Sequence, residues 1–218
     1  MSKQTIYIKY VDYWYGFDHQ SEYFWILLSN EFNLVYSDNP DFIIYSNYGL
    51  EHLQYDCIRI FISYENERPN FNVCDFAITP DYCNSRYHYQ MPVFATVIDK
   101  KRLIQTNKDE LFFDWKNRDQ FCSFVVSNEK CKKRNDLFRF LNKNYSRVNS
   151  GGKTFNNIGG PINDKIKFLS KHKFNIAFEN SSYPGYVTEK ITDAFIANTI
   201  PIYWGEKKLI NILIQSDL

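Results

Sequence analysis

One stretch of the sequence, residues 173–205, constrains the fold of the whole chain because it has the pattern of a complete βαβ unit. Its first segment, Lys173–Phe178, is an apolar run with the length of a buried strand, and Ile200–Trp204 is a second such run, closed by Gly205. Between them, apolar residues recur at helical spacing: Val187, Ile191, Ala194 and Phe195. Strands joined by a helical crossover are normally parallel, so the stretch predicts an α/β protein.

The turn before this helix, Glu179–Gly185, places polar residues at the carboxyl end of a strand, where open α/β sheets bind ligands. Thr188 is the expected N-cap, so Lys190 falls in the first helical turn. A cation there opposes the helix dipole by roughly 0.3–1 kcal/mol unless an anion binds beside it. Free amides and an ammonium group suit a phosphate, and Glu189 can accept from a sugar hydroxyl. From these residues alone, an ordinary solvated helix start remains the alternative.

Composition bounds the class of protein. The 218 residues suffice for one large or two small domains, and 44% hydrophobic content argues against disorder. A net charge of +1 gives no support to a nucleic-acid partner. Five cysteines, odd in number and without a CxxC pair, favour a reducing compartment. Because we find neither a signal peptide nor a membrane span, we expect a cytoplasmic protein. The sequence does not indicate an oligomeric state.

The remainder of the chain has the same α/β pattern. Ser21–Phe32 predicts a helix with Ser21 as its N-cap, and Lys132–Asn142 and Ile162–Ser170 predict two more. The charged run Asp114–Asp119 is the best linker candidate, and it divides the chain into domains 1–117 and 118–218. Short apolar runs predict mostly parallel strands at Ile6–Ile8, Asn33–Tyr36, Phe42–Tyr45, Ile58–Ile62, Phe76–Ile78 and Phe121–Val126.

Residues 178–205 also carry a motif, FENSSYPGYVTEKITDAFIANTIPIYWG. It resembles the signature of the α-1,3-fucosyltransferases, glycosyltransferase family ten: FENS, a short spacer, YVTEK, an apolar helix and a strand that ends in Gly. The match is long and nearly free of gaps. In that family the segment holds the GDP of GDP-fucose. The resemblance therefore implies donor contacts at Asn180, Tyr186, Glu189 and Lys190.

The resemblance implies a GT-B-like fold, in which two Rossmann-like domains face a cleft. Residues 1–117 would form the acceptor side and residues 118–218 the GDP-fucose side. Only Glu206–Leu218, enough for about one helix, follow Gly205, so we expect the second domain to be incomplete. No two aspartates lie two positions apart, which indicates no Asp-x-Asp metal motif. We therefore expect no metal and no cofactor beyond GDP-fucose as substrate, with positive side chains neutralising the diphosphate.

The segment FISYENERPNFN resembles the family's GEN-x-x-P-N-F stretch, whose Glu is regarded as the general base. That position is Glu65, just beyond the predicted strand Ile58–Ile62, at the edge expected for an active site. Without the motif, Glu65 reads as an exposed loop carboxylate. Tyr64 stands where the family has Gly. Since a non-Gly residue does not adopt positive φ cheaply, the loop must differ locally if the family backbone needs that conformation.

A third segment, FCSFVVSNEKCKKRN, resembles a family strand that ends in Val-x-SN and leads into a helix whose Arg grips the diphosphate. That Arg corresponds to Arg134, and a guanidinium can bind phosphate oxygens with two parallel bonds. Ser127 and Asn128 are weaker candidates for donor contacts.

Together these matches predict an inverting fucosyltransferase of the bacterial or viral soluble kind. Glu65 would act as the base, and Glu189 would support charge on the fucose ring. The expected acceptor is the O3 hydroxyl of N-acetylglucosamine in a lactosamine-type glycan, which gives Lewis-type structures; 1,3 and 1,4 linkage are not resolved. The alternatives are a non-catalytic or truncated GDP-sugar-binding remnant, and a GT-B transferase with another nucleotide-sugar donor.

Overall fold

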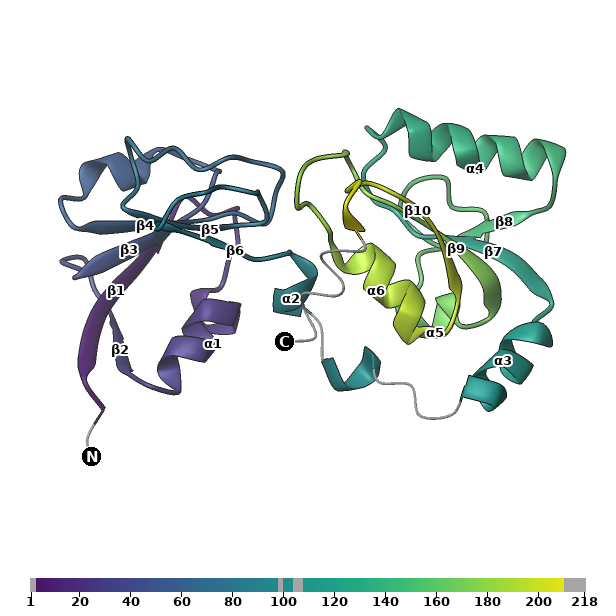
Figure 1. Ribbon diagram of the computed structural model, residues 1–218, viewed down its shortest axis with the longest axis horizontal. Helices are drawn as coiled ribbons and strands as arrows, with labels where there is room; N and C mark the ends of the chain where they lie inside the picture. The colour runs from purple at the N-terminus through teal and green to yellow at the C-terminus, as the bar shows by residue number, and fades with distance from the viewer. Residues whose placement is uncertain (1–2, 98–99, 104–107, 210–218) are drawn as a thin grey trace. The chain divides into compact units, whose positions relative to one another are not determined.

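The structure, a computed structural model, describes residues 3–97, 100–103 and 108–209. The chain forms two compact units, residues 1–96 and 97–218, and each contains its own parallel sheet (Figure 1). The predicted α/β class is therefore confirmed.

The first unit is built on six strands in the order β2-β1-β3-β4-β5-β6, and every neighbouring pair is parallel. Its strands are β1 (Thr5–Val11), β2 (Asn33–Tyr36), β3 (Phe42–Tyr45), β4 (Ile58–Ile62), β5 (Phe76–Thr79) and β6 (His88–Gln90). Its helices are α1 (Tyr23–Ser29), α2 (Phe94–Val97, which reaches the boundary) and the short 3-10 turns η1 (His19–Ser21) and η2 (Glu51–Gln54). The five predicted strands of this half are confirmed, whereas β6 is too short and polar to be predicted from its residues.

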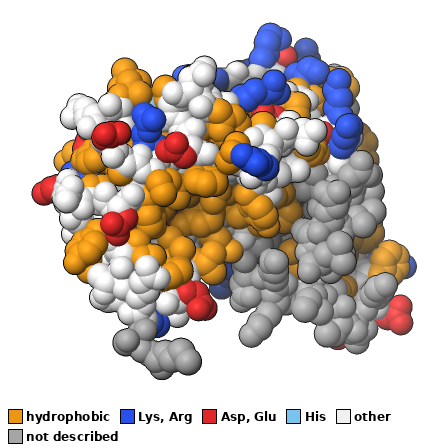
Figure 2. Space-filling view, turned by 60° about the vertical axis from the view of Figure 1, so that its left-hand side comes forward, with side chains coloured by type: hydrophobic (Ala, Val, Ile, Leu, Met, Phe, Trp, Pro, Cys, Tyr) orange, Lys and Arg blue, Asp and Glu red, His pale blue; other side chains and the backbone are white. Residues whose placement is uncertain are grey.

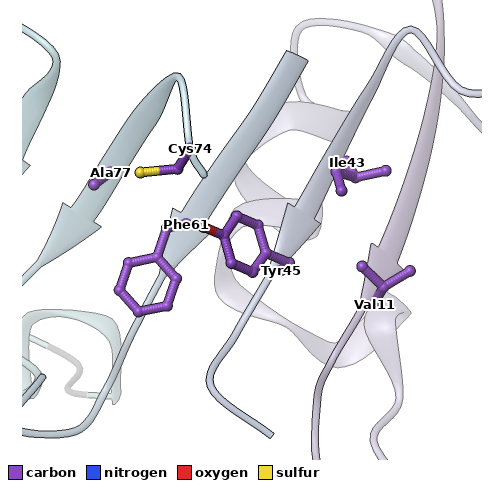
Figure 3. Close-up of a cluster of buried hydrophobic side chains, with 6 residues drawn as sticks. All are labelled: Val11, Ile43, Tyr45, Phe61, Cys74 and Ala77. Carbon is purple, nitrogen blue, oxygen red and sulfur yellow. The ribbon is translucent and has the colours of Figure 1, made fainter. Parts of the chain in front are cut away.

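The middle of the first sheet is buried on both faces. Because side chains alternate along a strand, Ile43 and Ile44 of β3 enter different hydrophobic clusters on opposite faces. In one of them the Tyr45 and Phe61 rings lie 5.2 Å apart between centroids (Figure 3). Both clusters continue to the carboxyl ends of the strands, so they support the loops that start there.

Helix α1 covers part of one face of this sheet. Its Phe24 is buried, whereas Ile26 and Leu27 are 52% and 48% exposed. Figure 2 shows apolar side chains gathered in a patch on one face of the molecule.

The N-cap of α1 is Glu22 and not the predicted Ser21: a carboxylate oxygen of Glu22 accepts from the Phe24 and Trp25 amides at 2.7 and 3.1 Å. A carboxylate satisfies these amides with a full negative charge, which the helix dipole favours.

The second unit contains four parallel strands in the order β10-β9-β7-β8. Its strands are β7 (Gln120–Phe124), β8 (Val148–Ser150), β9 (His172–Phe178) and β10 (Ile200–Trp204). Its helices are η3 (Lys100–Leu103), α3 (Lys108–Lys116), α4 (Lys132–Asn144), α5 (Lys165–Leu169) and α6 (Glu189–Ile196). The predicted βαβ unit is confirmed as β9-α6-β10, with Ile200 opposite Phe174 and Trp204 opposite Phe178. The helix expected after Gly205 lies mostly outside the described residues.

The run Asp114–Asp119, predicted as a linker, packs within the second unit. The Trp115 indole donates to the Lys173 carbonyl at 2.8 Å, and Arg118 donates to the His172 and Asn198 carbonyls, both at 2.9 Å. These bonds attach the run to the ends of β9 and β10. The compact units divide between residues 96 and 97, and the domain boundary at 117/118 stays a prediction.

No helix within residues 3–97, 100–103 and 108–209 is long and apolar enough to cross a bilayer. All five cysteines are free thiols.

Gly152 brings the glycine-rich loop after β8 against the end of β7. A Cβ atom built on Gly152 lies 2.1 Å from the Val126 carbonyl oxygen, whereas one on Gly151 meets only side chains, nearest the Ile162 Cγ2 at 2.6 Å. Backbone cannot move aside as a side chain can. We therefore expect Gly152→Ala to reduce the free energy of unfolding by about 3 kcal/mol, and Gly151→Ala by less, in urea titrations. Equal losses would contradict the backbone clash.

Candidate active site

Arg134, on the first turn of α4, reaches the segment that follows β9. Its side chain is buried, and its Nη1 donates to the Phe178 carbonyl at 3.3 Å and to Asn180 Oδ1 at 2.9 Å. Nη2 donates to the Asn128 carbonyl, while Nε lies buried with no hydrogen-bond partner among the described residues. Burial lowers the pKa of Arg134, although the nearby Glu179 carboxylate raises it. The guanidinium thus connects α4 and the β7 loop to the end of β9.

Lys190 approaches the same segment from α6. Its Nζ donates to Glu179 Oε2 at 3.2 Å and to the Thr188 hydroxyl at 2.8 Å, and it lies 3.7 Å from Glu189 Oε1. The Glu179 carboxylate is fully buried and also accepts from the Thr188 amide and hydroxyl at 2.8 and 2.7 Å. Two cations, Arg134 and Lys190, therefore converge on residues 178–180 beside the amino end of a helix.

Thr188 holds the predicted N-cap position, with an extended backbone. Its hydroxyl bonds Glu179 and makes no capping bond to an α6 amide in the described structure. Thr188 therefore leaves the first amides of α6 without an N-cap side chain, an arrangement that is compatible with anion binding.

Glu189 begins α6 and is partly exposed. Its carboxylate lies 3.8 Å from Lys165 Nζ, and Lys165 in turn pairs with Asp193 at 2.7 Å. Burial raises the pKa of Glu189, but the positive charges of Lys190 and Lys165, together with hydrogen bonds to the carboxylate, lower it, so the net pKa is below its ordinary value. The carboxylate is therefore ionised at neutral pH and available as a hydrogen-bond acceptor.

The remaining predicted donor contacts surround this point. Tyr186 is buried, and Asn180 is half-buried and held by Arg134. Ser127 and Asn128 are exposed in the loop after β7, where the Asn128 side chain accepts from the Lys130 amide at 2.8 Å. All seven donor-binding candidates therefore belong to the second unit. Ser127, Asn128 and Asn180 follow the carboxyl ends of β7 and β9, Arg134 lies on the first turn of α4, and Tyr186, Glu189 and Lys190 lie just before α6 or on its first turn.

The loop between β9 and α6 is fastened to the end of β10. The Glu179 amide donates to the Trp204 carbonyl at 2.8 Å, and the Ser182 hydroxyl donates to the Gly205 carbonyl at 2.7 Å. The Gly185 amide donates to the buried Glu206 carboxylate. The loop is thus held along its length by residues 204–206, at and just after the end of β10.

Glu65 lies in the first unit, three residues beyond β4, and is half-buried. Its amide donates to the Ser63 hydroxyl at 3.1 Å. Among the described non-glycine residues, positive φ occurs at Asp12, Phe155 and Asn198, so Tyr64 has an ordinary backbone conformation. The loop therefore accommodates Tyr64 without the strain that a glycine-specific conformation would impose.

A pocket of about 370 Å³ opens next to this loop, within the first unit. Its apolar lining includes Tyr45, Leu53 and Phe61, and its polar lining includes Glu67 and Arg68. This size and mixture are typical of small-ligand sites.

Sequence reasoning missed three residues that organise the site. Glu179 reads as a turn residue, although its place directly after a buried strand and before Asn180 was an available signal. Lys165 comes from α5, 24 positions before Glu189, and Glu22 reads as a first-turn surface residue; only the packed structure brings them to their partners. No three His, Cys, Asp or Glu side chains of the described chain gather as a metal site.

Comparison with known proteins covers both units. Residues 8–97 match the family described as "Alpha-(1,3)-fucosyltransferase FucT N-terminal domain". Residues 115–217 match "Glycosyltransferase family 10 (fucosyltransferase) C-term".

Individual relatives in the comparison are also fucosyltransferases. The chain is 32% identical to "Alpha-(1,3)-fucosyltransferase FucT" of Helicobacter pylori over 88% of its own length and 49% of that protein, so it spans about half of that relative. It is 30% identical to human "4-galactosyl-N-acetylglucosaminide 3-alpha-L-fucosyltransferase 9" over 44% of its length and 26% of that protein. A solved α1,3-fucosyltransferase structure with GDP-fucose superposes with a TM-score of 0.77 at 27% identity, covering 94% of this chain and 70% of the other.

Proposed function

Because the chain belongs to the fucosyltransferases of glycosyltransferase family 10, we propose that it transfers L-fucose from GDP-fucose to a sugar hydroxyl. The observation that carries this proposal is the convergence of Arg134 and Lys190 on residues 178–180, beside the uncapped amino end of α6. Two fixed cations and a helix dipole are the groups that a departing diphosphate needs.

The reaction is a single displacement. Glu65 takes the proton of the acceptor hydroxyl while its oxygen forms a bond to fucose C1. The bond from C1 to the β-phosphate oxygen breaks, and its electron pair leaves with GDP. The configuration at C1 is thereby inverted, and Glu65 returns its proton to water.

The second unit binds the donor. Arg134 and Lys190 neutralise the charge that develops on the diphosphate, so the proposal needs no metal and no cofactor. Asn180 and Tyr186 contact the nucleotide sugar, with Ser127 and Asn128 as further contacts. Glu189 accepts from a sugar or ribose hydroxyl and supports positive charge on the fucose ring.

The first unit binds the acceptor. We assign O3 of N-acetylglucosamine in a lactosamine-type glycan, in accord with the activity in the human relative's name. The 370 Å³ pocket supports this assignment, because its aromatic walls and its polar groups of both signs suit a neutral sugar ring.

The test is turnover by the purified chain with N-acetyllactosamine and GDP-fucose, GDP-mannose or UDP-galactose in parallel. We expect transfer from GDP-fucose alone, with an α-1,3 linkage in the NMR spectrum of the product. Turnover with another donor would assign a different transferase. Calorimetric binding of GDP without any turnover would identify a nucleotide-binding protein that does not catalyse.

A further inference from the structure

Tyr64, the residue directly before the proposed base, reaches across the first unit to α1. Its hydroxyl donates to Oε1 of Glu22, 42 positions earlier in the chain. Its ring packs against the hydrophobic cluster that contains Tyr10, Phe24 and Ile62. The backbone that leads into Glu65 is therefore fixed by a side chain that is both packed and hydrogen-bonded.

The partner of Tyr64 is itself rigidly held. Glu22 is 6% exposed, and its other oxygen, Oε2, accepts three bonds: from the Phe24 amide at 2.7 Å, the Trp25 amide at 3.1 Å and the Tyr10 hydroxyl at 3.1 Å. A carboxylate held by a helix terminus and a strand cannot follow a loop that moves. It is an anchor, and Tyr64 is the attachment to it from the β4 loop.

The tyrosine hydroxyl remains a donor throughout the working range of pH. Burial raises the pKa of Tyr64 well above its ordinary value, and the adjacent Glu22 charge adds to the effect. The residue before Tyr64 also contributes, because the Ser63 hydroxyl accepts from the Glu65 amide at 3.1 Å. The backbone that leads into Glu65 is thus constrained by two successive side chains.

We propose that Tyr64 is a positioning residue for the transfer reaction, which aims Glu65 by tying its loop to Glu22 at the start of α1. The proposal rests on the function inferred above. It predicts an effect on the chemical step and none on donor binding, because the donor-binding candidates belong to the second unit. A base held out of line by about 1 Å loses one to two orders of magnitude in rate.

The test compares two matched variants, Tyr64→Phe and Tyr10→Phe. Each deletes one hydroxyl that donates to Glu22, but only Tyr64 adjoins Glu65. We expect Tyr64→Phe to lower kcat about 10- to 100-fold with KM for GDP-fucose and the Kd of GDP unchanged. We expect Tyr10→Phe to keep kcat within about twofold. Thermal unfolding curves of the two variants define an assay temperature at which each variant is folded.

A double-mutant cycle with Glu22→Gln identifies the route. If Tyr64 acts through Glu22, the double variant Tyr64→Phe with Glu22→Gln has a kcat no lower than that of the less active single variant. Additive losses, or equal kcat in Tyr64→Phe and Tyr10→Phe, would overturn the proposal. An inactive parent chain, or a Glu65→Gln variant as active as the parent, would instead refute the proposed function or its base.

Discussion

Replacing Glu65 by Gln is expected to lower kcat for fucosyl transfer by about 10²- to 10⁴-fold, the range found for removal of a positioned general base. The amide keeps the size and shape of the carboxylate but cannot take the acceptor proton. The affinity for GDP is expected to stay at the parent value, because the donor-binding candidates lie on the second unit. Initial rates with GDP-fucose and N-acetyllactosamine measure the first effect, and calorimetric titration of GDP measures the second.

The matched control is Glu67→Gln, which neutralises another carboxylate of the same loop. Glu67 is exposed, and its amide donates to the Glu65 carbonyl at 2.8 Å, a backbone bond that the substitution leaves intact. We expect its kcat to stay within about fivefold of the parent value, because no proton transfer is assigned to Glu67; since Glu67 lines the pocket assigned to the acceptor, a change in acceptor binding would appear in KM for the acceptor. If both variants lost activity equally, the base would have to be sought elsewhere.

Much of the fold was predictable because many of its strands are short, mainly apolar runs. Phe42–Tyr45, Ile58–Ile62 and Ile200–Trp204 occupy the predicted residues as β3, β4 and β10. Such runs indicate strands buried on both faces, as parallel sheets require. By contrast, β6 and β8 span three residues each, His88–Gln90 and Val148–Ser150, and no periodicity can be read from three residues.

The packing of residues 114–119 was not predictable from local charge. Asp114–Asp119 resembles a solvated linker, yet Trp115 and Arg118 fasten it to backbone carbonyls of the second sheet. Their partners lie more than 50 positions away in the sequence, and hydrogen bonds to distant carbonyls leave no mark on composition.

The kind of site could be predicted from the sequence, but the contacts among its residues could not. The motif identifies Arg134, Glu189 and Lys190, and their chemistry suits an anion. It does not reveal that Arg134 is buried under residues 178–180, or that Glu179 is the counter-charge of Lys190. Those features depend on how two strands and two helices meet, so they follow from the packed structure alone.

Lys190→Gln is expected to cause the second large effect, a fall in kcat of about 10²- to 10³-fold with weaker GDP binding. The neutral amide cannot stabilise the charge on the departing diphosphate. Lys190 also pairs with the fully buried Glu179 at 3.2 Å, so the substitution leaves a buried carboxylate without its cation. We therefore expect stability to fall by about 3 kcal/mol in urea titrations. Taken alone, lost activity would not separate catalysis from folding.

The double variant Lys190→Gln with Glu179→Gln separates the two effects. A glutamine at position 179 can still accept from the Thr188 amide through its carboxamide oxygen, and its NH2 group can donate to the Thr188 hydroxyl; these two groups now bond Glu179 at 2.8 and 2.7 Å. The glutamine carries no charge to leave unpaired. Stability should therefore recover most of the loss, while kcat stays at the Lys190→Gln level because the cation is still missing. Recovery of kcat together with stability would show that Lys190 serves the fold and that the charge on the leaving group is neutralised by other residues.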